Sequence, residues 1–321
     1  MIISSLLLVL ASAPGDGPCT NEQAYKTPGR WLPASDDTAM ADRTFPRAEY
    51  KTLNAKADRA IELLKKSIPD LTGLDAKAYR SIRGDSYVKD GPVKFGVNSL
   101  YLSYYCVPAK GYMASIAGTV QPGGETGTWI YIDFNGLNWL ANERMMFTGF
   151  KTTKGNAILF MPKSGGTLRG FELLLPDIHH GKRSEEAMVL APEGKSPYKP
   201  LSREKFLLAR QAYAEQQKRP EEAAKIAAMI AAMSPEDREA QAVVKDYYAL
   251  DPAKIFVPES GGGTPLATIS HAFFDVKGSR SAIRMITVYW SWDQDVPTKV
   301  ALIKQFKENF DFEALKKMIE E

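Results

Sequence analysis

A run of short segments with alternating polar and apolar residues occupies the chain from about Val93 to Leu190. Successive side chains on a strand point to opposite faces of a sheet, so this alternation indicates strands. Turns containing Gly and Pro separate the segments at the spacing of an antiparallel sheet, and no βαβ rhythm of about 30 residues indicates a doubly wound nucleotide fold. The expected strands are GVNSLYLSYYCV (96–107), YMASIAGTV (112–120), TWIYIDFN (128–135), NAILFMP (156–162), RGFELLLP (169–176) and EAMVLAP (186–192). The sequence therefore predicts a mainly antiparallel sheet.

Helical patterns precede this β region and follow it. Residues 48–71 repeat apolar side chains every three or four positions, which predicts an amphipathic helix that Pro69 ends. A further strand is expected at 284–292, where it rejoins the main sheet, and a last helix runs from about Thr298 to Glu320. That last helix is expected to dock on the body through Phe310, Phe312, Leu315 and Met318.

A helical insertion is expected at about 202–250. Ser202, Pro220 and Ser234 are start signals for three successive helices, and the second helix is rich in Ala and carries a stripe of Ile and Met. We therefore predict an α+β fold with an N-terminal helix, this insertion and a C-terminal helix, all within a single domain over 47–321.

The N-terminus has the pattern of an export signal. An apolar core at Ile2–Leu10 is followed by Ala11-Ser12-Ala13, the small-x-small pattern that signal peptidases accept, although the usual positive start is missing. A buried N-terminal helix is the alternative, but the run from Pro14 to Pro18 cannot continue a helix. We predict a signal peptide at 1–13, an extended lead-in at 14–46, and a periplasmic or secreted protein.

Export bears on the oxidation state of the two cysteines. In an oxidising compartment Cys19 and Cys106 are expected to form a disulfide, which ties the N-terminal segment to an aromatic strand. Two unpaired thiols are the alternative.

Composition excludes several classes of protein. The formal net charge of +3 and the pI of about 8.6 are too mild for nucleic-acid binding. No apolar run reaches the roughly 18–20 residues that span a membrane. No cofactor motif is present: the Gly-rich stretches 163–167 and 259–265 lack the setting and the Gly-Lys-Ser/Thr of a P-loop, and both are expected to be turns.

Metal binding has weak support. His179 and His180 lie beside Asp177, and His271 could supply a third ligand. Adjacent side chains on a strand point to opposite faces, so a polar turn is the favoured interpretation and we predict no metal.

The match Ser202-x-x-Lys205 has the spacing with which penicillin-recognising enzymes activate a serine. Their later Lys-Thr/Ser-Gly strand is missing, since Lys163-Ser164-Gly165 precedes Ser202. We therefore interpret Ser202 as a helix N-cap and Lys205 as a solvated side chain.

Two kinds of residue remain as candidates for function. Paired carboxylates could hydrolyse glycosides, and the candidate acids are Asp133, Glu172, Asp275 and Asp293. Aromatic side chains with polar rims bind sugars, peptides or lipids, although they also simply pack sheets against helices. The candidate aromatic residues are Tyr101, Tyr105, Trp129 and Tyr131.

Three stretches, with a Pro-Gly-x-Trp at 28–31, resemble a group of exported proteins of Gram-negative bacteria. The stretches are ETGTWIYIDFN (125–135), SPYKPLSREKFL (196–207) and FKENFDFEALKKMIEE (306–321). In that group the second stretch more often has Val-Thr where this chain has Leu201-Ser202, and Tyr in place of Phe206. The resemblance implies export and a shared architecture, and it transfers no catalytic residues.

The favoured function is an exported, non-enzymatic binding or envelope-associated accessory protein, whose partner is a glycan, a peptide or an envelope protein. The alternative is an exported hydrolase of glycans or peptides that uses paired carboxylates. No complete catalytic constellation is present, which favours the first.

Overall fold

The computed structural model describes residues 18–36, 46–108, 114–123, 128–137, 158–176, 183–275 and 278–320. The expected signal peptide (1–13) and three of the weak metal candidates, Asp177, His179 and His180, lie outside the described residues.

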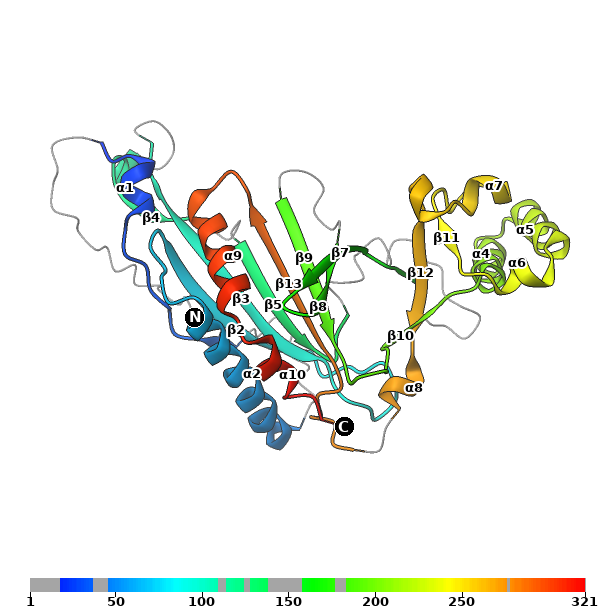
Figure 1. The fold of residues 1–321 in the computed structure, drawn as a ribbon, viewed down its shortest axis with the longest axis horizontal. Coiled ribbons are helices and arrows are strands. Elements are labelled where there is room, and N and C mark those ends of the chain that lie inside the picture. The colour runs from blue at the N-terminus through cyan, green and yellow to red at the C-terminus, as the bar shows by residue number, and fades with distance from the viewer. Residues whose placement is uncertain are drawn as a thin grey trace.

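A nine-stranded sheet forms the body of the molecule (Figure 1). The strands run in the order β1-β2-β3-β5-β13-β9-β8-β7, with β4 paired to the end of β3. Their bounds are β1 Ser35–Asp36, β2 Leu74–Ile82, β3 Phe95–Cys106, β4 Val120–Pro122, β5 Thr128–Phe134, β7 Lys163–Leu168, β8 Phe171–Leu175, β9 Arg183–Leu190 and β13 Ile286–Asp293. All pairs are antiparallel except β1 with β2. The predicted α+β class is confirmed.

The C-terminal strand lies in the middle of this sheet. β13 pairs with β5 on one side and with β9 on the other, and Tyr289 lies opposite both Tyr131 and Ala187. The prediction that the last strand rejoins the main sheet is correct.

Three helices cover one face of the sheet: α2 (Arg47–Ser67), α9 (Pro297–Asn309) and α10 (Phe312–Lys316) (Figure 1). The apolar stripe of α2 packs with Ile130, Ile132 and Phe134 of β5 in the largest hydrophobic cluster. The helix ends before Pro69, as the sequence predicts.

The expected last helix is broken in two, which corrects that prediction. Phe310 leaves the helical conformation at the end of α9, and the side chain of Asp311 accepts a hydrogen bond from the Ala314 amide to begin α10. The break lets Phe306, Phe310 and Phe312 pack against one another in the core. The expected docking residues are all buried.

The opposite face of the sheet is also covered. Tyr131, Tyr289 and Ala187 pack there with Phe274 of α8 (His271–Phe274) and with Leu159 of β6 (Ile158–Phe160). The described part of the segment NAILFMP thus does contain a strand, β6. This strand belongs to a second sheet, in which β12 (Thr264–Ile269) pairs with β6, β10 (Tyr198–Pro200) and β11 (Val243–Val244).

The second sheet leads into a group of helices that projects from the body, and we call residues 202–256 the helical lobe (Figure 1). Its elements are α4 (Arg203–Gln216), α5 (Pro220–Ala232), α6 (Pro235–Glu239), β11 and α7 (Pro252–Ile255). Ser202 and Ser234 are N-caps whose side chains accept backbone hydrogen bonds, and Pro220 begins α5. The lobe has its own hydrophobic cluster, which includes Phe206, Leu207 and Ile226.

Residues 18–36 form a strap along the edge of β2. The strap contains α1 (Asn21–Tyr25) and β1, and its Trp31 packs edge-on against Tyr101 with ring centroids 5.8 Å apart. A side chain at Gly29 would place its Cβ 1.6 Å from the Leu74 carbonyl oxygen, so only glycine allows this approach. The Cys19–Cys106 disulfide fastens the strap to the end of β3, as the sequence predicts.

Several shorter elements differ from the secondary structure that the sequence predicts. Residues 163–167 were expected to be a turn, yet they lie in β7, which pairs with β8 and has a bulge between Ser164 and Thr167. In the described part of YMASIAGTV, a 3₁₀ turn (Ala114–Ile116) precedes the short β4. The stretch 259–265 does contain a 3₁₀ turn, Glu259–Gly261, as expected, but β12 begins at Thr264.

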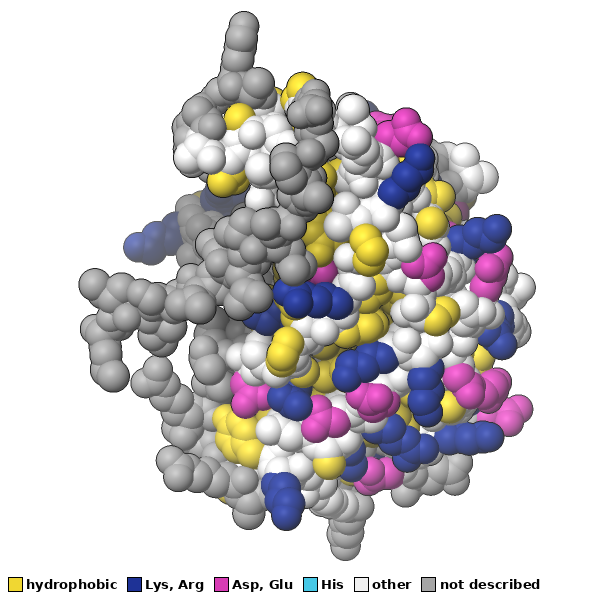
Figure 2. All heavy atoms as spheres, turned by 90° about the vertical axis from the view of Figure 1, so that its left-hand side faces the viewer, with side chains coloured by type: hydrophobic (Ala, Val, Ile, Leu, Met, Phe, Trp, Pro, Cys, Tyr) yellow, Lys and Arg dark blue, Asp and Glu magenta, His cyan; other side chains and the backbone are white. Residues whose placement is uncertain are grey.

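Charged side chains of both signs are mixed on one face of the molecule (Figure 2). Figure 2, which views the molecule from the left-hand side of Figure 1, shows Lys and Arg interspersed with Asp and Glu. Among the described residues, no helix is long and apolar enough to cross a bilayer.

Candidate functional site

Asp133 is the most perturbed of the predicted acids. It lies on β5 with 4% of its surface exposed, on the sheet face that carries Tyr131. Burial raises the pKa of Asp133 to about 6, and the nearby charges of Arg83 and Lys94 partly oppose that rise. Its Oδ2 has no hydrogen-bond partner within the described residues.

The space that holds Asp133 depends on the neighbouring strand. Gly96 of β3 lies opposite it, and a Cβ on Gly96 would come within 2.8 Å of the Asp133 Oδ1. Tyr87 lies near enough for the Asp133 charge to contribute to the raised pKa of its phenol, which burial dominates. The Tyr87 oxygen accepts a hydrogen bond from the Leu137 amide at 3.0 Å. Asp133 is thus enclosed by its own sheet and the connection before β3.

The four predicted acids do not form a pair across a cleft. Asp133 of β5 lies opposite Thr287 of β13, and Thr287 lies opposite Val189 of β9. The β8–β9 pairing, continued by two residues, places Glu172 of β8 beside Val189. Three strand spacings therefore separate Asp133 from Glu172, which is about 14 Å. Glycosidase acids lie about 5–10 Å apart.

The other two acids lie elsewhere. Asp293 ends β13, six positions along the strand from Thr287, and accepts a hydrogen bond from the Asp295 amide at 3.0 Å. Asp275 is exposed at the end of α8.

The candidate aromatic residues mostly pack the interior. Tyr101 is fully buried on the helix-covered face, and Tyr131 is 9% exposed on the other. Trp129 is half-buried and stacks on Tyr131 with centroids 5.4 Å apart. Tyr105 is half-buried on β3, opposite Gln121 of β4. These four residues do not share one open surface, because Tyr101 and Tyr131 face opposite sides of the sheet.

His271 is exposed at the start of α8. Within the described ranges, no group of three His, Cys, Asp or Glu side chains could hold a metal ion.

The helical lobe carries an open groove of about 700 Å³ between α5 and the segment that leads into α7. Its apolar lining residues are Ala228, Met229, Ala232, Met233, Leu250, Pro252, Ala253 and Phe256. Arg203, Lys225 and Asp237 complete the lining, and Arg203 pairs with Asp237 at 2.8 Å. We call this feature the lobe groove.

A buried arginine shapes one wall of the lobe groove. Arg210 is 1% exposed, and its Nη1 and Nη2 donate to the carbonyl oxygens of Ala249 and Tyr248 at 2.7 and 3.1 Å. These contacts hold the loop on which Leu250 is 40% and Tyr248 is 50% exposed. Large apolar side chains are therefore presented to solvent beside the groove.

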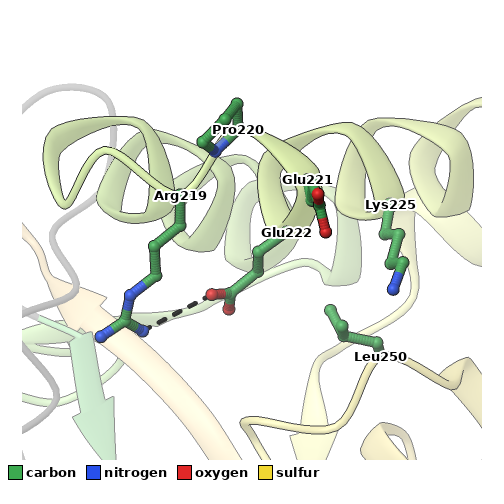
Figure 3. A pocket seen from close by; sticks show the side chains of 6 residues that line it. All are labelled: Arg219, Pro220, Glu221, Glu222, Lys225 and Leu250. Carbon is green, nitrogen blue, oxygen red and sulfur yellow. Dashed lines mark ion pairs between the residues drawn. The ribbon is translucent and has the colours of Figure 1, made fainter.

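A second hollow of about 380 Å³ continues from the groove at the start of α5. Figure 3 shows Lys225 and Leu250 close to each other there, with Arg219 and Glu222 joined by an ion pair of 3.5 Å. Lys225 and Leu250 line both hollows. Lys225 itself has no ion-pair partner within the described parts of the chain.

The stripe of Ile and Met predicted on α5 packs against the hydrophobic cluster of the lobe. Of its residues, Ile226 is fully buried, whereas Met229, Ile230 and Met233 are only partly buried, and both methionines also line the groove. The available signal was the Ala-rich composition of α5, which has apolar residues around more of the helix than one buried face needs.

Comparison of the chain with protein-family models, with curated protein sequences and with solved structures finds no match.

Proposed function

We propose that the protein is an exported, non-enzymatic binding or envelope-associated accessory protein, and that the lobe groove binds an apolar segment of a partner protein. The observation that carries the proposal is the groove itself, with its Met, Ala and Phe lining and the exposed Leu250 at its edge. Contiguous apolar surface rimmed by polar residues is typical of interaction sites.

The chemistry of the groove suits a protein segment. Met229 and Met233 have flexible, polarisable side chains that adapt to varied apolar partners. The small side chains of Ala228 and Ala232 allow a partner backbone to approach α5 closely. The paired Arg203 and Asp237 form a polar rim that can fix the orientation of the partner.

Export belongs to the same proposal. The signal-like residues 1–13, the resemblance to exported proteins of Gram-negative bacteria and the Cys19–Cys106 disulfide support it. A periplasmic or secreted protein with a docking lobe would serve as an accessory factor in the envelope.

A hydrolase that uses paired carboxylates has less support. The raised pKa of Asp133 suits a general acid, but Asp133 is buried and lies about 14 Å from Glu172 by strand spacing. Asp275 follows α8 and Asp293 lies at the end of β13, six positions from the Thr287 that faces Asp133, so neither supplies the second acid beside Asp133.

Site-specific photo-crosslinking tests the binding proposal. A benzophenone amino acid at Ala232, which lines the groove, should give a discrete adduct with one protein in the organism that produces the chain. Ala231 is the matched control, because it is exposed on the same helix and does not line the groove.

The adduct should disappear when Met229→Asp places a charge in the groove. The purified partner should then bind the wild type and bind the Met229→Asp variant at least tenfold more weakly. Equal adducts from both alanine positions, or an adduct that survives Met229→Asp, would contradict the proposal.

A further inference from the structure

A separate small pocket lies where the main sheet meets the second sheet. Glu172 and Leu174 of β8, Val189 of β9 and the turn from Lys195 to Tyr198 line it. Its volume is about 190 Å³, which is below the roughly 300–1,000 Å³ of pockets that hold drug-sized ligands. A ligand of this pocket must therefore be small.

Two opposite charges line the pocket. Glu172 and Lys195 are both exposed at its walls, and neither forms an ion pair with the other or with any other described residue. Across the described surface, many other charged side chains are paired, such as Lys307 with Glu186 at 2.8 Å. The pocket is thus lined by one anionic and one cationic side chain, neither of which has an ion-pair partner among the described residues.

The rest of the lining is apolar and aromatic. Leu174 and Pro197 are buried, and Val189 is half-buried. Tyr198 is half-buried. Burial raises the pKa of the Tyr198 phenol, and the negative charge of the nearby Glu172 raises it further. Glu172 and Tyr198 line the same small pocket, so an ammonium group held by Glu172 would have an aromatic ring nearby, and aromatic rings attract cations.

The hydroxyl of Ser196, the remaining polar side chain of the turn, is engaged within the turn. The Ser196 hydroxyl already donates to the Tyr198 carbonyl oxygen at 2.8 Å, which fixes the turn. The side-chain groups that line the pocket and can contact a polar ligand are then the Glu172 carboxylate, the Lys195 ammonium and the Tyr198 phenol.

We propose that this pocket binds a free α-amino acid with an apolar side chain. Glu172 holds its ammonium group, Lys195 holds its carboxylate, and Leu174, Val189 and Pro197 contact its side chain. An α-amino acid carries both charges on a frame small enough for the pocket, whereas a longer peptide exceeds its volume. This site lies apart from the lobe groove and does not rest on the function proposed for the groove.

Isothermal titration calorimetry on the mature protein with L-leucine is the direct test. L-leucine should bind, while 4-methylpentanoate, which lacks the ammonium, and 3-methylbutylamine, which lacks the carboxylate, should bind about tenfold more weakly or worse. L-valine and L-alanine bind progressively more weakly as apolar contact with the pocket is lost.

Substitutions of Glu172 and Lys195 test whether these two charges bind the amino acid. Glu172→Gln and Lys195→Gln should each weaken L-leucine binding about tenfold or more. Glu193→Gln and Lys199→Gln are matched controls, since both residues are exposed nearby and neither lines the pocket, and they should leave binding unchanged. The double variant Glu172→Lys with Lys195→Glu should regain part of the binding that either single reversal removes.

Two results would overturn the proposal. The first is the absence of binding by folded wild-type protein of L-leucine, L-valine and L-alanine at millimolar concentration. The second is binding that the uncharged variants leave intact. Loss of the crosslink at the lobe groove would not affect either measurement, so failure of one proposal is distinguishable from failure of the other.

Discussion

The sheet body and the helical lobe differ in how far they cover their apolar side chains. In the body, α2, α9 and α10 cover one face of the sheet, and α8 with the second sheet packs on the other. In the lobe, Met229 and Met233 pack against the small cluster around Phe206 and Ile226 but remain partly exposed in the groove, and Leu250 is 40% exposed. A region that has more apolar surface than its own core requires is the better candidate for binding.

The buried charged residues of the sheet body and of the helical lobe also differ in how they are compensated. Asp133 in the body has an unpartnered Oδ2 and an elevated pKa, so its burial destabilises the fold once it ionises. Arg210 in the lobe donates to two carbonyl groups and lies 3.7 Å from Glu222. One charge therefore makes the body sensitive to pH, and the other positions a loop of the groove.

The largest effect is expected from removing the disulfide of the body. Replacement of Cys19 and Cys106 by Ser should lower the free energy of unfolding by about 4–5 kcal/mol, because it opens a long loop in the unfolded chain. Urea denaturation of the oxidised wild type and the double variant measures this loss. Hydrogen exchange should locate it in the strap and β3, with the helical lobe unchanged. If protection falls in the lobe as well, the two regions are not separate in stability.

Asp133 should give the body a distinct pH dependence. Its pKa is 3.8 when unfolded and about 6 when folded, so the native state binds the proton more tightly between these values. Its contribution to stability is therefore present below about pH 4 and is lost as the pH rises through about 6, a difference of roughly 3 kcal/mol. The difference in unfolding free energy between wild type and Asp133→Asn, measured from pH 4 to pH 7, should follow this curve. A constant difference would show that Asp133 titrates normally.

The smallest effect is expected at the first helix of the lobe. Ser202→Ala should cost about 1 kcal/mol, because the Ser202 side chain caps α4 by accepting from the Lys205 amide. Lys205→Ala should change stability by a few tenths of a kcal/mol, since that side chain is exposed. Thermal denaturation of both variants checks this. An equal loss in both would indicate that the two side chains act together, as a serine–lysine pair would.

Elements with strong local signals could be predicted from the sequence. Periodic apolar residues located α2 and the long strands β3 and β5, and cap residues located α4, α5 and α6. β2 does not alternate between apolar and polar residues, because most of its residues are buried between the strap and the rest of the sheet. The sequence pattern therefore did not predict this strand. β7 contains two glycines that favour a turn, and only its pairing with β8 makes it a strand.

The candidate sites depended more on packing. Burial of Tyr101 against Trp31 removes it from any surface, although its sequence context matches that of the half-buried Tyr105. Glu172 was singled out for hydrolysis, whereas the side chains that share its pocket, Lys195 and Tyr198, lie more than 20 positions away in the chain and carry no motif.

The sequence by itself determined the α+β class, the cysteine pair and the capped helices of the lobe, because each depends on spacing or on residues close in the chain. Tertiary structure decided where the acids lie relative to one another, which aromatic residues are buried and which face of α5 remains open. These features depend on strand order and on the register between distant segments, and neither is encoded in any single stretch of residues.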